Sequence, residues 1–125
     1  MKPAIELWSF GFKYGAIEAN LVIDVRFLPN PYYVPALSHM TGKDGECAAY
    51  VFKDPDTRIF ADALAGLVIS MERSFGQQEK AILKVAIGCT GGRHRSVAVA
   101  EDLARALQAR DLAPALRHKE LEKSS

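Results

Sequence analysis

Hydrophobic and polar residues follow two different periods along this chain of 125 residues. Alternation, or a short run of apolar and β-branched residues, predicts strands over 5–10 and 21–27. Residues 81–89 (AILKVAIGC) are apolar almost throughout, which is typical of a strand buried on both faces of a parallel sheet. A last strand is predicted over 115–121. The pattern therefore predicts the strands of one small sheet.

Between these strands, apolar residues recur three or four positions apart, which is the spacing of one helix face. One helix is predicted over 57–75, with Asp56 or Thr57 as its N-cap, and a second over 95–110. The expected core positions are Phe60, Leu64, Leu67, Val68, Met71 and Phe75 in the first, and Val97, Ala100, Leu103, Ala104 and Leu107 in the second. Strands alternating with helices favour an α/β fold, a three-layer sandwich with a small, mainly parallel sheet. A single domain over residues 1–125 is expected.

A long connection over 28–45 interrupts this alternation and contains three prolines and two glycines. Connections of this length are uncommon inside compact domains and are often functional. Tyr32 and Tyr33 lie within it.

Composition narrows the class of protein. The chain is 49% hydrophobic and 25% charged, ordinary for a globular domain, and no run approaches the ~20 apolar residues of a membrane span. The segment after Met1 lacks a secretory signal, and Cys47 and Cys89 make no disulfide framework, so a soluble cytoplasmic protein is expected. The net charge of +1 argues against a surface that is basic throughout. His39 and His118 lack the spacing of a zinc site, so neither metal nor cofactor is expected.

The strongest chemical signal is the segment 87–96 (IGCTGGRHRS), which lies between a predicted strand and a predicted helix. In open α/β sheets, ligands bind at the carboxyl ends of strands. The first N–H groups of the following helix lack intrahelical partners and lie at the positive end of its dipole. Gly91 and Gly92 let the backbone curl so that these donors converge on one anion.

Side chains of the same segment add positive potential. Arg95 offers a bidentate guanidinium and Ser96 a hydroxyl, while Arg93 and His94 are expected to supply further positive charge. A phosphate or another compact oxyanion is the ligand that this combination predicts. The alternative is a plain glycine turn with solvated arginines.

The spacing C-x-x-G-x-x-R-S within this segment also resembles the active loop of cysteine-dependent protein phosphatases. Cys89 would then attack phosphorus, and Arg95 would hold the phosphoryl oxygens. Gly88 stands where those enzymes have a histidine, and no aspartate is singled out as the general acid. Cys89 is therefore either a nucleophile or a small residue at the end of a strand, and an enzyme is the less favoured interpretation.

Five blocks, in order along the chain, carry a resemblance to a known family. They are SFGFK at 9–13, DVRFLPNP at 24–31, MTG at 40–42, the segment 87–96 and RHKELEK at 117–123. Together they resemble the C-terminal domain of the bacterial RNase adapter RapZ and its relatives of the YvcJ type. In that family the domain follows a kinase-like domain with a P-loop. Nothing in this chain matches that loop, so a free-standing C-terminal domain is expected.

The resemblance implies a phosphofructokinase-like α/β architecture and a binding site for an amino-sugar phosphate such as glucosamine-6-phosphate. It also implies RNA binding and self-association as a homo-oligomer, with a small RNA, an endoribonuclease and a separate kinase-like protein as candidate partners. The implied ligand-binding residues are Thr90, Gly91, Gly92, His94, Arg95, Ser96, Asp24, Arg26, Asn30 and Tyr32. The candidate RNA-binding residues are Lys13, Arg117, Lys119 and Lys123. Lys13 either extends a basic rim for RNA or is a solvated surface lysine, and the Arg117–Lys119 cluster is either an RNA-contacting edge or a plain polar strand end.

Three functions remain open from the residues alone. The favoured one is a binding module that senses a phosphorylated metabolite and passes that state to an RNA or protein partner. The alternatives are a cysteine-dependent phosphatase and an RNA-binding module without small-molecule control. Asp24 and Arg26 are two residues apart in a predicted strand and share one face, so they either contact the ligand or form a bracing ion pair.

Overall fold

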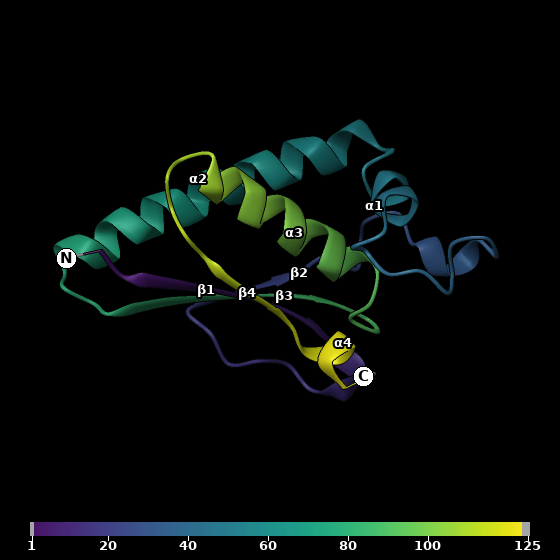
Figure 1. Cartoon of the computed structure of the whole chain (residues 1–125), viewed down its shortest axis with the longest axis horizontal. Coiled ribbons are helices and arrows are strands. Elements are labelled where there is room, and N and C mark those ends of the chain that lie inside the picture. The colour runs from purple at the N-terminus through teal and green to yellow at the C-terminus, as the bar shows by residue number, and fades with distance from the viewer. Residues whose placement is uncertain (1, 124–125) are drawn as a thin grey trace.

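The fold is described by a computed structural model, in which residues 2–123 are placed. Four strands form one sheet in the order β2-β3-β1-β4, and every neighbouring pair is parallel (Figure 1). The strands are β1 (Ala4–Gly11), β2 (Leu21–Asp24), β3 (Ile82–Cys89) and β4 (Ala115–His118). Together with the helices that flank the sheet, this confirms the predicted α/β class and is consistent with a three-layer sandwich.

The two long helices match their predictions closely. They are α2 (Pro55–Gln77) and α3 (Arg95–Gln108). The N-cap of α2 is Asp54, earlier than expected, because its carboxylate accepts a hydrogen bond from the Asp56 N–H at 3.0 Å and Pro55 occupies the first helical position.

Elsewhere the predicted boundaries were wrong. The strand expected over 21–27 ends at Asp24. The Val25 N–H makes the last hydrogen bond to β3, to the Gly88 carbonyl, and the chain turns away from the sheet after it. The strand expected over 115–121 ends at His118, and a helical turn, α4 (Lys119–Glu122), follows it. The connection over 28–45 holds a 3-10 turn, η2 (Pro31–Tyr33), and leads into a short helix, α1 (Gly45–Val51), that the apolar pattern did not reveal.

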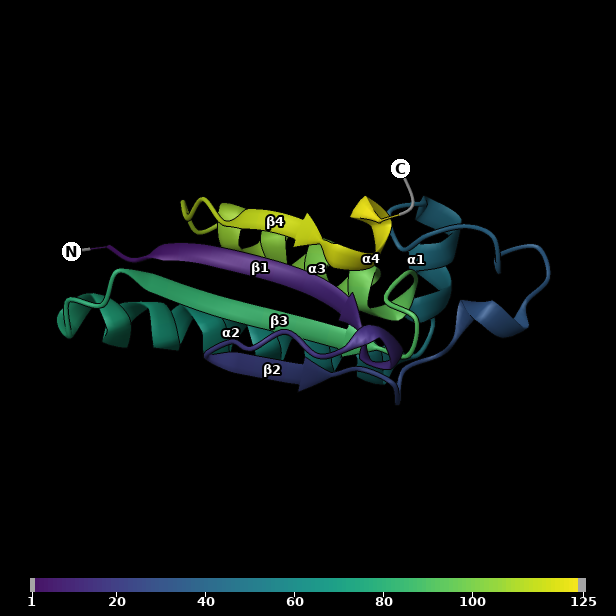
Figure 2. The same cartoon turned by 90° about the horizontal axis from the view of Figure 1, so that it is seen from below.

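The connections between strands decide which face each helix covers. The links from β2 to β3 and from β3 to β4 step in one direction across the sheet, and α2 and α3 lie on one face (Figures 1 and 2). The link from β1 to β2 steps in the opposite direction, and residues 12–20, including the 3-10 turn η1 (Phe12–Tyr14), run over the other face. This is what right-handed crossovers require. The connections leaving the neighbouring strands β1 and β3 therefore run to opposite faces of the sheet. Open α/β sheets bind ligands at the carboxyl ends of two strands whose connections diverge in this way.

The hydrophobic core fills the space between the sheet and the two long helices. It is contributed by alternate residues of the strands and by the inner faces of the helices, and its fully buried members include Leu7, Leu83, Ile87, Val68, Val99, Leu103 and Leu107. Burying a side chain of this size contributes about 1.5–3 kcal/mol, so this face anchors β1 and β3 firmly. Among residues 2–123, no helix has the length and apolar character needed to cross a membrane.

Candidate anion-binding site

The glycine-bearing loop joins the carboxyl end of β3 to the N-terminus of α3. It runs from Thr90 to His94, and His94 occupies the N-cap position without any side-chain hydrogen bond to the helix. The first N–H groups of the 14-residue helix thus have no side-chain cap, and its dipole places partial positive charge at the same end. Both features suit an anion.

The loop packs so closely against the end of β1 that only glycine fits. Gly92 has a φ of +73°, and a Cβ there would come within 2.5 Å of the Gly11 nitrogen. A Cβ on Gly11 would in turn come within 2.6 Å of the Gly91 carbonyl carbon. The Lys13 N–H donates to the Thr90 carbonyl at 3.2 Å. The end of β1 therefore fixes the path of the loop.

A second segment, from the long connection before α1, braces the loop from another side. The Gly42 N–H donates to the Arg93 carbonyl at 2.8 Å, and His94 Nε2 donates to the Ser38 carbonyl at 3.0 Å. Burial, with repulsion from Arg93 and Arg95, lowers the pKa of His94 more than its hydrogen bonds to the backbone of Ser38 and Met40 raise it, so the ring is neutral at pH 7. His94 acts as a brace for the loop rather than as a source of charge.

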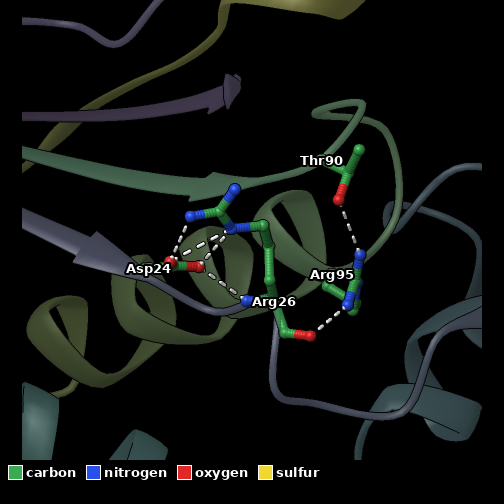
Figure 3. Close-up of polar contacts among 4 residues, drawn as sticks. All are labelled: Asp24, Arg26, Thr90 and Arg95. Carbon is green, nitrogen blue, oxygen red and sulfur yellow. Dashed lines mark hydrogen bonds and ion pairs between the residues drawn. The ribbon is translucent and has the colours of Figure 1, made fainter. Parts of the chain in front are cut away.

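Arg95 is the central side chain of the site, and it is only 6% exposed. One terminal nitrogen, Nη1, donates to the backbone carbonyl of Arg26, and Nη2 lies 3.4 Å from Thr90 Oγ1 (Figure 3). Its Nε has no hydrogen-bond partner within residues 2–123. A buried guanidinium with a donor left over is costly unless an anion completes its hydrogen bonding.

Asp24 and Arg26 form an ion pair with each other at the end of β2. Arg26 Nη2 lies 2.7 Å from Asp24 Oδ2 and Arg26 Nε lies 3.0 Å from Oδ1, and both side chains are about half exposed. The Arg26 hydrogen bonds hold the pKa of Asp24 below its usual range. The guanidinium also lies over the Phe12 ring, 4.2 Å from its centroid. Figure 3 shows the Arg26 side chain turned to Asp24 while its carbonyl faces Arg95.

A cavity of about 320 Å³ opens beside Arg95. Its lining comes from four segments: η1, η2, the connection before α1 and the glycine loop. The lining residues are Lys13, Tyr14, Asn30, Tyr32, Tyr33, Ser38, Cys89, Thr90, Gly91, Arg93, His94 and Arg95. Lys13, Arg93 and Arg95 bring positive charge, and no Asp or Glu of residues 2–123 is part of the lining. The cavity is suited to an anionic ligand.

The structure thus brings together six of the ten residues expected to bind ligand. They are Thr90, Gly91, His94, Arg95, Asn30 and Tyr32. The other four lie outside the lining. Gly92 is on the side of the loop that packs against Gly11, Ser96 is buried beside Cys89, and the Asp24–Arg26 pair is at the end of β2. Tyr14, Tyr33 and Ser38 line the cavity but were not expected to, because nothing in the sequence shows how these loops fold over the glycine loop.

Cys89 lines the cavity but is only 3% exposed. Its thiol donates to Ser96 Oγ at 3.1 Å. No carboxylate of the described residues shares the lining with Cys89. The other cysteine, Cys47, is buried in α1, and desolvation raises its pKa to about 11.

Three of the four residues expected to bind RNA lie around Tyr14: Lys13 and Lys123 contact its ring, and Lys119 Nζ donates to its carbonyl at 3.3 Å. The fourth, Arg117, lies on β4. Arg117 pairs with Glu122 at 2.9 Å and covers the Trp8 ring at 4.6 Å.

Glu120 lies behind the glycine loop and holds the two lysines of this region. Its carboxylate lies 3.3 Å from Lys119 Nζ and 3.2 Å from Lys123 Nζ, and it accepts the Gly11 N–H at 3.0 Å. Burial would raise the pKa of Glu120, but the Gly11 hydrogen bond and the two lysines outweigh this and lower it. Sequence reasoning missed this residue, because Gly11 and Glu120 are 109 positions apart.

No group of three His, Cys, Asp or Glu side chains in the described part of the chain could hold a metal ion.

Fold and site together define a class of protein: a small parallel α/β domain with a cationic loop at the carboxyl edge of its sheet. The chain belongs to the RapZ C-terminal domain family, whose model matches residues 3–122.

Its relatives are longer proteins. It is 46% identical over 122 residues to the "Nucleotide-binding protein YvcJ" of Bacillus subtilis, covering 97% of this chain and 41% of that protein. A "Nucleotide-binding protein" of Caldicellulosiruptor bescii is 44% identical over 120 residues, or 95% of this chain and 41% of its own length. A "Nucleotide-binding protein" of Bacillus licheniformis is 47% identical over 122 residues, which cover 97% of this chain and 41% of that protein. The chain thus spans about two fifths of these relatives.

Proposed function

We propose that this domain binds a small phosphorylated metabolite, with the phosphate held by the loop Thr90–His94 and the N-terminus of α3. The observation that carries the proposal is the buried Arg95, whose Nε lacks a partner within residues 2–123 beside a cavity lined by three cationic side chains. A phosphate oxygen at this place would accept from the Arg95 guanidinium and from the uncapped N–H groups of α3. Lys13 and Arg93 would add attraction from other parts of the lining.

The body of the ligand would lie toward the connection between β2 and α1. Asn30, Tyr32 and Ser38 line that part of the cavity and offer groups that suit the hydroxyls of a sugar. An amino-sugar phosphate such as glucosamine-6-phosphate is the first ligand to test, because the family resemblance implies it. The relatives are named as nucleotide-binding proteins, which also agrees with a phosphorylated ligand.

We further propose that ligand binding serves regulation rather than catalysis, with RNA or a protein as partner. The described lining has no carboxylate to act as an acid, and Cys89 is buried against Ser96. Lys119 begins α4, Lys123 directly follows it, and Glu120 of the same helix contacts Gly11 directly behind the loop. An RNA or protein that contacts these two lysines would therefore lie close to the ligand.

Calorimetric titration with glucosamine-6-phosphate, glucose 6-phosphate and inorganic phosphate tests the proposal. Arg95→Met should weaken each by about 100-fold, because charge-assisted hydrogen bonds contribute about 1.5–3 kcal/mol each. Arg110→Met, at an exposed position near the end of α3, is the matched control and should bind like wild type. Arg95→Lys, which keeps the charge but loses the planar fork, should fall between them.

Absence of binding by every phosphate, or equal binding by wild type and Arg95→Met, would overturn the proposal. Cys89→Ser separates it from the phosphatase alternative. The variant should still bind phosphate, and neither it nor wild type should hydrolyse an aryl phosphate. Hydrolysis by wild type that Cys89→Ser abolishes would establish the enzyme instead.

A further inference from the structure

Three exposed tyrosines share the cavity with the cationic loop. Tyr14, Tyr32 and Tyr33 all line it, and they are 53%, 65% and 78% exposed. They come from η1 and η2, which lie far apart in the sequence. Large exposed aromatic side chains gathered at one cavity commonly mark a surface that packs against a ligand.

The Tyr32–Tyr33 pair is mounted on a well-braced turn. Pro31 begins η2 and is buried, and the Val34 N–H donates to its carbonyl at 3.0 Å. The Asn30 side chain accepts the Tyr32 N–H at 3.2 Å. The two rings meet edge to face, with centroids 5.6 Å apart and planes at 81°. In such an arrangement the two rings do not cover each other face to face, so a flat ring can stack on the pair.

The third ring is occupied in a different way. The Tyr14 ring is near two ammonium groups: its centroid lies 5.1 Å from Lys13 Nζ and 5.3 Å from Lys123 Nζ. These cations use its π surface, which leaves Tyr32 and Tyr33 as the rings that can receive a ligand. The segment that carries them extends beyond the carboxyl ends of the strands in both views (Figures 1 and 2).

The charges of the cavity narrow the ligand further. No carboxylate of the described chain lines it, while the cationic loop favours a phosphate. A ligand that uses both the loop and the exposed tyrosines carries a phosphate at one end and a flat ring at the other. Stacking of a nucleobase on an aromatic side chain contributes about 1–3 kcal/mol.

We propose that the cavity also binds nucleoside monophosphates, with the phosphate in the glycine loop and the base stacked on the Tyr32–Tyr33 pair. This inference rests on the proposed phosphate site and assigns a base-binding surface to this domain itself. It predicts that a nucleobase strengthens binding relative to the bare sugar phosphate.

Titration with AMP, UMP, ribose 5-phosphate and inorganic phosphate tests it. AMP should bind wild type at least about 5-fold more tightly than ribose 5-phosphate, the lower end of the stacking contribution. The double variant Tyr32→Ala/Tyr33→Ala should lose this advantage while its affinity for inorganic phosphate stays unchanged. Tyr32→Phe/Tyr33→Phe should keep the advantage, because phenylalanine still stacks. Tyr50→Ala, on α1 outside the lining, is the control and should match wild type.

The outcomes separate this inference from the proposal beneath it. Equal affinities of AMP and ribose 5-phosphate in wild type, with inorganic phosphate still bound, would overturn the base-binding surface and leave the phosphate site standing. Retention of the AMP advantage by the double alanine variant would also overturn it. Failure of all four compounds to bind would overturn both.

Discussion

Two of the buried polar clusters in the described part of this domain differ in whether the protein completes their hydrogen bonding. In one, Ser9 Oγ lies 2.6 Å from His118 Nδ1, and His118 Nε2 lies 2.7 Å from Glu101 Oε2. Both ring nitrogens thus have a partner, and the cluster joins β1, β4 and α3. In the other, Arg95 is bound to the Arg26 carbonyl and to Thr90, yet its Nε lacks a partner in the described chain.

Whether every buried polar group has a partner distinguishes a structural polar cluster from one that binds a ligand. Buried polar groups are nearly always hydrogen-bonded, so a completed cluster such as Ser9–His118–Glu101 needs no ligand and holds its elements together. It has no residue in the lining of the cavity. The Arg95 cluster lies beside the cavity, and its guanidinium has hydrogen-bonding capacity that the described chain does not use. Burial alone would not separate them, since Arg95 is 6% exposed and His118 is 8% exposed.

The largest expected effect on stability comes from changing a glycine in the loop that leads into Arg95. Gly92→Ala should destabilise the fold by about 2–5 kcal/mol, because alanine is strained at a φ of +73° and its Cβ would overlap the end of β1. The free energy of unfolding in urea measures this. Gly66→Ala is the matched control: it lies in α2 with open space around it, and alanine there should stabilise by about 0.5–1 kcal/mol. Equal stability of the two variants would contradict the packing described for the loop.

The completed cluster should affect stability and not ligand binding. His118→Leu leaves the Ser9 hydroxyl and the Glu101 carboxylate without their shared partner, which should cost about 2 kcal/mol of unfolding free energy. The phosphate affinity of the folded protein should stay unchanged. His39→Leu, at an exposed position, is the control and should change stability little. Loss of phosphate affinity in His118→Leu would show that the two clusters are not separate.

A smaller effect, on the pH dependence of stability, should distinguish His94 within the incomplete cluster. Its pKa is lowered from 6.5 by burial in the folded state, so below about pH 6.5 the unfolded chain binds a proton that the folded chain does not. Stability should therefore fall as the pH drops below 6.5, and the fall should stop once the folded ring is itself protonated.

Urea unfolding across this pH range measures the slope. In His94→Gln, whose side-chain N–H can still donate to the Ser38 carbonyl, the His94 contribution should disappear. An identical slope in wild type and His94→Gln would contradict a neutral, buried His94.

The parts of the fold that were predicted correctly are those that a simple hydrophobic period determines. The apolar run of β3 and the stripe of α3 placed both elements within two residues, and the glycines and arginines between them pointed to an anion. The parts that were missed depend on contacts between distant segments. Glu120 behind Gly11, and Ser38 beside His94, become neighbours only after the sheet and the long connection have folded. The same holds for His118, an unremarkable member of a basic stretch in the sequence, which the pairing of β4 with β1 places inside a buried cluster.

Nitrogen–proton NMR spectra during a phosphate titration test the central claim most directly, because they report on each donor separately. The Arg95 Nε–H resonance and the backbone N–H resonances of the glycine loop should shift together and saturate at one affinity. The resonances of the Ser9–His118–Glu101 cluster should move little. Shifts confined to other regions, with Arg95 Nε–H unchanged at saturating phosphate, would contradict the assignment of Arg95 as the donor reserved for a ligand.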